Sequence, residues 1–145
     1  MKKAYILFTT VLFLTGFLQA QVVTGNLNLL KNAEIKLEGF NGLKNYSIST
    51  TKTDSAGNFK LSYSANDLGV GYLMTSDNKP FFVILNGENI EIAGEALSYP
   101  ESIRITKGKE NQLFEQYVKE HSIREQALSA WIYLEKIYIG NTLLS

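Results

Sequence analysis

Apolar and polar residues alternate one by one in several short segments between residues 22 and 107. In Glu34–Glu38, for example, Ile35 and Leu37 fall on one side of the chain and the charged residues on the other. Because successive side chains of a strand point to opposite faces, the pattern predicts antiparallel strands with one buried face. Clusters of Gly, Asn and Asp separate the segments. The predicted strands are Val22–Leu29, Glu34–Glu38, Tyr46–Thr53, Asn58–Ser64, Gly71–Thr75, Phe81–Leu85, Asn89–Ile92 and Ser102–Thr106.

The segment Phe81–Leu85 is apolar throughout, which predicts a central strand covered on both faces. Asp54–Asn58 and Asp77–Pro80 carry turn residues, and Asn86-Gly87 predicts a two-residue hairpin. Short, regularly spaced strands of this kind predict an antiparallel β-sandwich or a partly open barrel. The residues predicted to contribute to the core are Ile35, Leu37, Phe59, Leu61, Tyr63, Phe82, Ile84, Ile90 and Ile92.

Beyond Gly108 the period changes to that of a helix. No glycine or proline occurs from Asn111 to Tyr138, and apolar residues recur at helical spacing. The pattern predicts one long helix, or two with a break near Ser122, and Gly140-Asn141 predicts its end. The chain is therefore expected to be mainly β with C-terminal α: a β domain over 21–107, a helical connector over 108–139 and a tail over 140–145.

The second half of the predicted helix carries more large apolar residues than an exposed helix of a small protein needs. These residues are Trp131, Ile132, Leu134, Ile137 and Tyr138. Their cover could come from the sheet, from a protein partner, or from a C-terminal domain that is absent here. We therefore expect that the chain pairs with a partner or is the N-terminal part of a longer protein, with the tail as a truncation point.

The first twenty residues have the three-part plan of a secretory signal peptide. Met1-Lys2-Lys3 is basic, the run Ala4–Leu18 is largely apolar, and Ala20 is a small residue at a plausible cleavage point. The run is short for a transmembrane helix, although an uncleaved anchor is the alternative. The expected location is the periplasm or the outer cell envelope, with membrane contact only through this segment before cleavage.

Composition narrows the function further. The 145 residues favour one domain, and 14 basic residues balance 14 acidic ones, which argues against nucleic acid as a partner. The chain has no cysteine and a single histidine, so disulfides, thiol catalysis and cysteine zinc sites are excluded. We expect a non-catalytic protein with no catalytic residue, no metal site and no cofactor.

Each remaining chemical candidate has an ordinary structural explanation. His121, with Glu125 four residues on, predicts a solvated helix histidine, because zinc sites have three or four protein ligands. The glutamates from Glu110 to Glu135 alternate with basic residues, which predicts a salt-bridged solvent face. Gly69-Val70-Gly71 precedes a strand instead of opening a helix, so it does not indicate a dinucleotide site. The aromatic residues that could line a sugar- or peptide-binding face, or simply pack, are Tyr46, Tyr63, Tyr72, Tyr99, Phe81 and Phe82.

Two resemblances follow from the motifs. Val23-Thr24-Gly25, Ala33–Leu37 and Thr53–Leu61 resemble the strand and hairpin motifs of prealbumin-like β-sandwiches in carboxypeptidase regulatory modules. This resemblance implies a fold and no activity.

The second resemblance covers nearly the whole chain. The Ala20-Gln21 start, the Asp54–Phe59 hairpin, Phe82–Ile92 and Ile105–Phe114 are similar to the N-terminal region of secreted Bacteroidota thioredoxin-like, AhpC-TSA-type disulfide oxidoreductases. Those proteins have a β-rich domain of unknown function and a helical connector before the thioredoxin domain. In them the connector begins with Gly-Ser, whereas Lys109 follows Gly108 here, which implies a weaker helix cap. Their active cysteines lie in the thioredoxin domain, so no catalytic residue is carried over.

The sequence thus favours a non-catalytic exported module that contacts a protein or positions a redox domain. A free-standing carbohydrate- or peptide-binding β-sandwich at the cell surface is the alternative, and a small hydrolase is the third reading.

Overall fold

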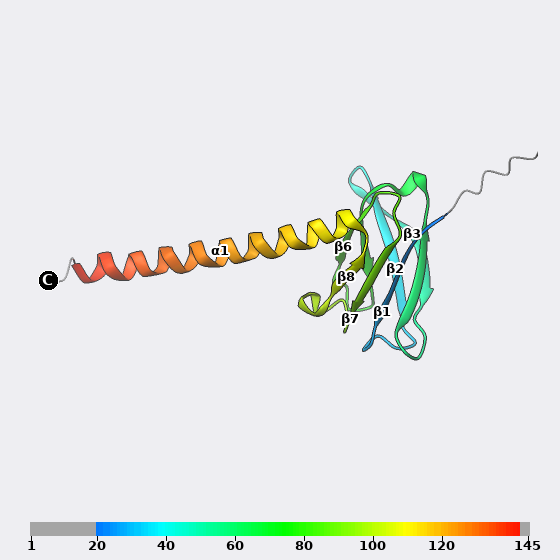
Figure 1. Cartoon of the computed structure of the whole chain (residues 1–145), viewed down its shortest axis with the longest axis horizontal. Coiled ribbons are helices and arrows are strands. Elements are labelled where there is room, and N and C mark those ends of the chain that lie inside the picture. Colours follow the sequence, from blue (N-terminus) through cyan, green and yellow to red (C-terminus); the bar gives the residue numbers. More distant parts are fainter. Residues whose placement is uncertain (1–19, 143–145) are drawn as a thin grey trace, which may run out of the picture.

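The computed structural model of the chain describes residues 20–142, with side chains described up to residue 139. Two four-stranded sheets, in the orders β4-β1-β7-β8 and β3-β2-β5-β6, face each other, and one long helix leaves them (Figure 1). The predicted fold class is confirmed: the protein is mainly β, a sandwich of two open sheets followed by a C-terminal helix. The predicted signal peptide, apart from Ala20, and residues 143–145 of the predicted tail lie outside the described residues.

All eight predicted strands are present, with boundaries shifted by a few residues. The strands are β1 Gln21–Leu27, β2 Glu34–Asn41, β3 Lys44–Lys52, β4 Asn58–Tyr63, β5 Gly69–Met74, β6 Phe81–Leu85, β7 Ile90–Gly94 and β8 Arg104–Lys107. Short 3-10 helices, Ala65–Asp67 and Pro100–Ser102, lie in two of the connections. All strand pairs are antiparallel except β1 with β7, which pair in parallel although about 67 residues separate them.

The core lies between the two sheets and is built from the inward-facing residues of the alternating strands. Seven of the nine residues predicted for it are buried. The two exceptions are on β6: Phe82 is 46% exposed and Ile84 is only half-buried, whereas Val83 and Leu85 are buried. The buried apolar residues of the core are Val23, Leu27, Ile35, Leu37, Phe59, Leu61, Tyr63, Leu73, Val83, Leu85, Ile90, Ile92, Leu97, Ile103 and Ile105.

The prediction that Phe81–Leu85 is a central strand is wrong. β6 pairs only with β5 and forms the edge of its sheet. An unbroken apolar run gives no period, so it does not show which face is buried. The outward side chains of β6 are apolar for another reason: Phe82 packs against Tyr72 of β5, at a ring-centroid distance of 6.0 Å.

The predicted hairpin at Asn86-Gly87 is also wrong. The segment links β6 in one sheet to β7 in the other, so it crosses the sandwich instead of joining paired neighbours. The Tyr63 hydroxyl holds this crossing, since it accepts from the Gly87 backbone N–H at 3.1 Å and donates to the Glu88 carbonyl at 2.5 Å. A two-residue loop after Asn41 does form a hairpin, where β2 pairs with β3 and Gly42 has φ +62°.

The predicted tight turn at Asp54–Asn58 is confirmed. The Asp54 carboxylate accepts from the backbone N–H groups of Ala56 at 2.8 Å and Asn58 at 2.9 Å, and from the Asn58 side-chain amide at 2.8 Å. These hydrogen bonds hold the pKa of Asp54 below its usual value, and the bond from the Asn58 side chain contributes most. Gly57 has φ +87°, and a Cβ atom there would lie 2.1 Å from the Leu27 carbonyl oxygen. The position therefore requires glycine.

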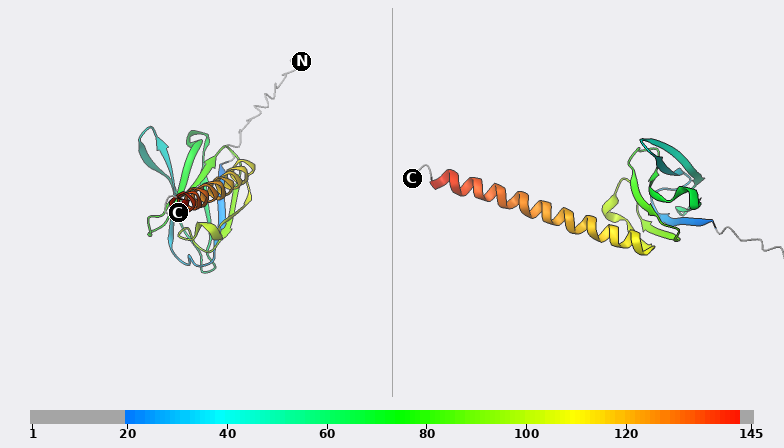
Figure 2. Two further views of the ribbon diagram at one scale, coloured as in Figure 1. Left: turned by 90° about the vertical axis from the view of Figure 1, so that its left-hand side faces the viewer. Right: turned by 90° about the horizontal axis from the view of Figure 1, so that it is seen from above.

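The predicted helix is a single one: α1 runs from Lys109 to Thr142 without a break at Ser122. It continues through Gly140 and Asn141, so the stop predicted there is wrong, since a glycine lowers helix stability by only about 1 kcal/mol. At about 1.5 Å per residue, α1 is about 51 Å long. It projects away from the strands in Figure 1 and in the right-hand view of Figure 2.

Candidate functional site

The first turns of α1 seal one edge of each sheet. The Asn111 side chain, which is fully buried, accepts from the Ile84 N–H at 2.7 Å and donates to the Ile84 carbonyl at 2.8 Å. The amide thus gives edge strand β6 the two hydrogen bonds that a neighbouring strand would have given. Open strand edges invite pairing with other chains, so this contact removes a hazard as well as fixing the helix.

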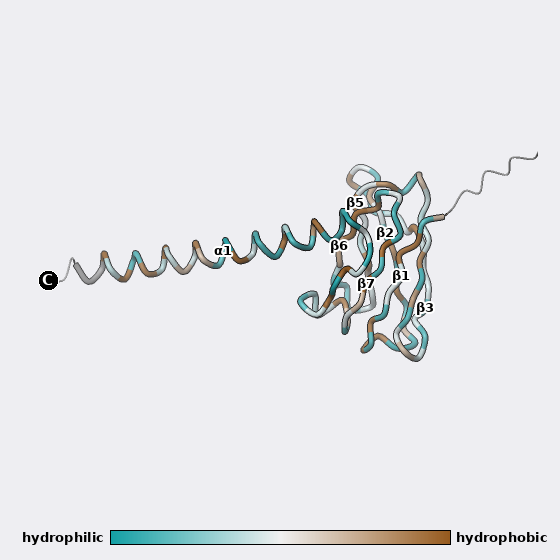
Figure 3. Tube along the Cα trace, viewed as in Figure 1, coloured by the Kyte–Doolittle hydropathy of each residue, from teal (hydrophilic) through white to brown (hydrophobic). Residues whose placement is uncertain are grey.

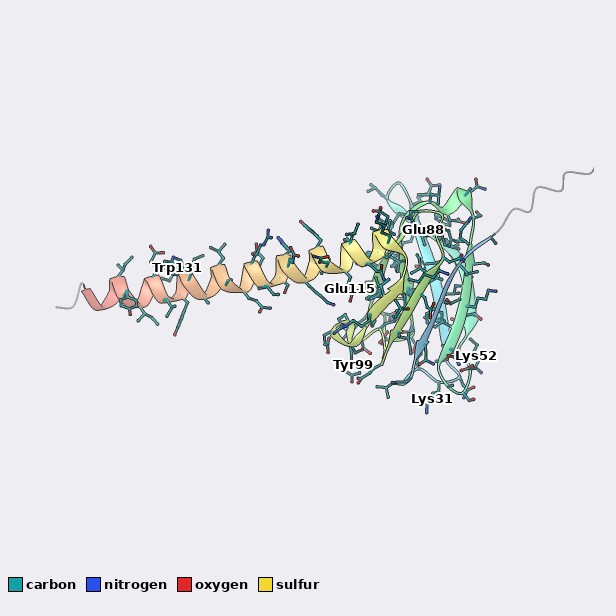
Figure 4. All side chains as sticks on the ribbon, viewed as in Figure 1. Lys31, Lys52, Glu88, Tyr99, Glu115 and Trp131 are labelled. Atoms are coloured by element: carbon teal, nitrogen blue, oxygen red, sulfur yellow. The ribbon has the colours of Figure 1, made fainter. Side chains whose placement is uncertain are left out.

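The same turns of α1 bind the edge of the other sheet, at β8. The Gln112 side-chain amide donates to the Ile105 carbonyl at 3.1 Å, and the Glu115 carboxylate accepts from the Ile105 N–H at 3.3 Å. Glu115 also pairs with Arg104, at 3.9 Å. Figure 4 shows Glu115 at the base of α1, beside the strands.

Glu88, in the crossing between β6 and β7, supplies the helix cap. Its carboxylate accepts from the Lys109 backbone N–H at 3.0 Å. Figure 4 shows Glu88 near the start of α1. The first four N–H groups of a helix lack partners within the helix, and a carboxylate there is also favoured by the helix dipole. Glu88 therefore provides the kind of contact that a serine after Gly108 would have provided. We call the contacts of Asn111, Gln112, Glu115 and Glu88 the junction.

Beyond the junction, the middle of α1 is polar and exposed. The predicted salt-bridged face is confirmed in part: Lys119 pairs with Glu115 at 2.7 Å, and Arg124 with Glu120 at 3.4 Å. His121 is exposed, its ring stacks on Tyr117 with centroids 5.9 Å apart, and its Nε2 lies 4.0 Å from Glu125. Among residues 20–142 no group of three or more His, Cys, Asp or Glu side chains is arranged to hold a metal ion.

The distal half of α1, residues 127–139, is rich in exposed apolar side chains. Trp131 is 69% exposed, and it lies far along the helix from the sandwich (Figure 4). Hydrophobic residues recur along this part of α1, which no strand touches (Figure 3). The sheet therefore does not supply the cover that the sequence left open. Other large residues of this half that are exposed are Leu128, Ile132, Tyr133, Leu134, Ile137, Tyr138 and Ile139. No helix within the described part of the chain is both long and apolar enough to span a membrane.

A second exposed surface lies on the outer face of the β3-β2-β5-β6 sheet. Tyr72 lies between Phe40 and Phe82, with ring centroids 5.3 and 6.0 Å away, and both phenylalanines are 46% exposed. We call these three residues the aromatic face. Of the other aromatic candidates, Tyr63 is buried in the core and Tyr99 is exposed elsewhere, on the loop before β8.

Polar groups adjoin the aromatic face. The Tyr72 hydroxyl donates to the Glu38 carboxylate and accepts from the Asn45 side-chain amide, at 2.8 Å. The bond to Glu38, together with burial, raises the pKa of Tyr72 above its usual value. A hollow of about 360 Å³ opens beside this network. Its lining residues are Glu34, Lys36, Glu38, Asn45, Tyr72, Met74, Thr75, Ser76 and Asn78.

Comparison with known proteins yields little. No protein-family model matches the chain, and no curated protein matches it. Among solved structures, a 9R-lipoxygenase from Cyanothece PCC8801 is similar, with 23% sequence identity over 44% of this chain and a TM-score of 0.35. The chain spans only 13% of the lipoxygenase chain. No activity follows for this chain from that likeness.

The apolar half of α1 could be predicted from the sequence, whereas the junction could not. Asn111 and Gln112 read as ordinary helix residues, and Glu88 read as part of a hairpin. Phe40 was missed as well, because it follows a glycine near a hairpin end.

Proposed function

We propose that this protein is a non-catalytic exported module that holds a partner protein or domain at a fixed distance from its β-sandwich. The partner contact is the distal half of α1, with Trp131, Ile132, Leu134, Ile137 and Tyr138 as the contact residues. The partner in this proposal is a redox domain of the thioredoxin type, in the periplasm or outer cell envelope, which the resemblance to the oxidoreductases suggests. The junction is the single observation that carries the proposal.

The arm is stiff where it meets the sandwich and exposed at its far end. A helix attached by its backbone alone could swing about Gly108. Here side chains from the first turns are hydrogen-bonded to the edge strands of both sheets, so the start of α1 is held at two points. The other end presents apolar side chains well away from the sandwich. A rigid arm with an apolar tip is suited to positioning and gives no basis for chemistry of its own.

Spin-label distance measurement tests the arm. The chain has no cysteine, so Lys60→Cys on β4 and Ser129→Cys on α1 place two labels specifically. Dilution with unlabelled chain removes distances between molecules. We expect one narrow distance distribution, which broadens when Asn111→Ala is added. A broad distribution in the parent protein would reject the positioning role.

Cell fractionation tests the location. If the first twenty residues are a signal peptide, the chain appears in the periplasmic or envelope fraction with its N-terminus near Gln21. A full-length chain that stays in the cytoplasm would contradict export, but it would not contradict the positioning role of α1.

A carbohydrate- or peptide-binding sandwich is the second candidate, and the aromatic face favours it. Sugars bind where exposed rings lie beside planar polar groups, and here Phe40 and Phe82 flank Tyr72, with Glu38 and Asn45 adjacent. A glycan array with the parent and with Phe82→Ala tests this. Binding that Phe82→Ala abolishes supports the candidate, and an array without binding removes the carbohydrate form of it.

A further inference from the structure

One side of the outer part of α1 is apolar without interruption. With 3.6 residues per turn, seven residues between 123 and 138 fall within an arc of about 120°. They are Ile123, Ala127, Ala130, Trp131, Leu134, Ile137 and Tyr138. We call this arc the stripe. Over residues 121–139 the rest of the helix carries charged or polar residues, such as Glu135 and Lys136, together with a smaller exposed apolar group on the opposite side, Leu128, Ile132 and Ile139.

The spacing within the stripe is that of a helix–helix seam. Ala127, Trp131, Leu134 and Tyr138 are separated by four, three and four residues, which is the heptad pattern of positions that pack between paired helices. The natural occupant of such a stripe is another helix. Leu128, Ile132 and Ile139 lie on the far side among charges and do not continue it.

We propose that the occupant is the same stripe of a second copy of this chain, in antiparallel orientation. When two such helices are set antiparallel about a point between Ile132 and Tyr133, Ala127 of each comes opposite Tyr138 of the other, and Trp131 comes opposite Leu134. At the two ends of the seam the small Ala127 then meets the large Tyr138, and in the centre Trp131 packs on Leu134.

The length of the arm favours this orientation. The centre of the pair lies about 35 Å along α1 from Lys109, so the two sandwiches of an antiparallel pair stand about 70 Å apart. In a parallel pair, the sandwiches would emerge at one level from helices about 8–10 Å apart. Each sandwich consists of two four-stranded sheets about 10 Å apart, so it is broader than the distance between the two helices. The two sandwiches of a parallel pair would therefore crowd each other.

The exposed area predicts a reversible contact. Trp131 is 69% and Tyr138 73% exposed, and Ile123, Leu134 and Ile137 are 66%, 49% and 42% exposed. Together these side chains offer on the order of 500 Å² per chain, below the roughly 800 Å² per partner of a standard interface. We therefore expect association in the micromolar range.

This inference rests on the surface used in the proposed function. A second copy would occupy Trp131, Leu134, Ile137 and Tyr138 in place of the redox domain, so the two partners would bind in alternation. The two proposals can fail separately, because the spin-label experiment tests a single diluted chain, whereas the experiment below tests association. A stiff arm on a monomer would retain the positioning role and reject the second copy.

Sedimentation equilibrium on residues 21–145 across the micromolar range is the first test. We expect a concentration-dependent dimer that Trp131→Glu and Leu134→Glu each weaken by tenfold or more. The matched control, Ile139→Glu, makes the same kind of change on the far side of the helix, outside the contact residues named above, and should weaken the dimer by less than threefold. A monomer throughout, or equal loss in the control, would overturn the proposal.

Cysteine pairing tests the orientation, since the chain has no cysteine of its own. A mixture of Ala127→Cys and Tyr138→Cys chains should form mixed disulfide-linked dimers under mild oxidation. Ala127→Cys alone should stay uncrosslinked, because its two copies lie about 16 Å apart along an antiparallel pair. Efficient crosslinking of Ala127→Cys with itself would indicate a parallel pair and reject the antiparallel one.

Discussion

The Asn111 side chain bonds both backbone groups of Ile84, 27 residues earlier in the chain, with its Oδ1 at 2.7 Å from the amide nitrogen and its Nδ2 at 2.8 Å from the carbonyl oxygen. One side chain thereby takes the place of a strand at the edge of the sheet. It also makes the helix and the sandwich parts of one hydrogen-bonded unit.

Asn111→Ala should lower the free energy of unfolding by about 2–4 kcal/mol, because it leaves two Ile84 backbone groups without partners, and such groups cost about 1–3 kcal/mol each when buried. Chemical denaturation measures the change, and hydrogen exchange at Ile84 should accelerate. Gln126→Ala, on the exposed part of α1, is the control and should change stability by no more than about 0.5 kcal/mol. An unchanged Ile84 exchange rate in Asn111→Ala would contradict the role assigned to the amide.

Val83→Ala and Phe82→Ala should show, by their different losses of stability, which face of β6 packs in the core. Val83 is buried in the core and Phe82 is 46% exposed, so we expect a loss of about 2–3 kcal/mol for the first and about 1 kcal/mol or less for the second. Thermal or denaturant unfolding measures both. The reverse order of the two losses would mean that β6 presents its other face to the core.

Gly57→Ala should be severely destabilising, by about 3 kcal/mol or more. Its Cβ would collide with the Leu27 carbonyl, and the backbone there has φ +87°. Gly42 makes a matched control, since its φ is +62° but nothing lies within 4 Å of its Cβ. Gly42→Ala should cost only the roughly 1–2 kcal/mol of the left-handed conformation. Equal losses would show that the contact with Leu27 is relieved by a small backbone shift.

Asp54 should make the sandwich sensitive to acid. Its folded-state pKa is below the value in an unfolded chain, so its contribution to stability is fully present above about pH 4 and is lost as the pH falls through the folded-state pKa. Asp54→Asn cannot titrate. Its Tm, about a few degrees below that of the parent at neutral pH, should therefore approach the parent's as the pH falls below about 4. If the Tm of Asp54→Asn and that of the parent fell equally with pH, groups other than Asp54 would cause the acid sensitivity.

The alternating strands could be predicted because their period is visible in the residues themselves. Ile35 and Leu37, or Phe59 and Leu61, show which face is buried, and all four are buried. The edge position of β6 could not be predicted, because an unbroken apolar run has the same sequence pattern at the edge of a sheet as at its centre. The open edge of β6 is covered by Asn111, which lies in α1. The residues around β6 give no indication of a partner so distant in the sequence.

The same limit applies to the candidate sites. The apolar excess around Trp131 is a local property of the helix, so the sequence predicted it. The cap of α1 comes from Glu88, which is 21 residues away from Lys109, and a rule based on the next residue along the chain missed it. Asn86-Gly87 has the chemistry of a hairpin, but pairing between sheets decided otherwise, because β7 finds its partners in β1 and β8.

The place of β1 between β4 and β7 also sets an order for folding. The first strand of the chain is an inner one, and its parallel partner ends at Gly94, so β1 lacks one of its two neighbours until more than ninety residues exist. Contacts so distant in sequence are slow to form, because a long loop must close before they contribute. A ribosome-bound or partly synthesised chain therefore cannot complete the sandwich until β7 has been made.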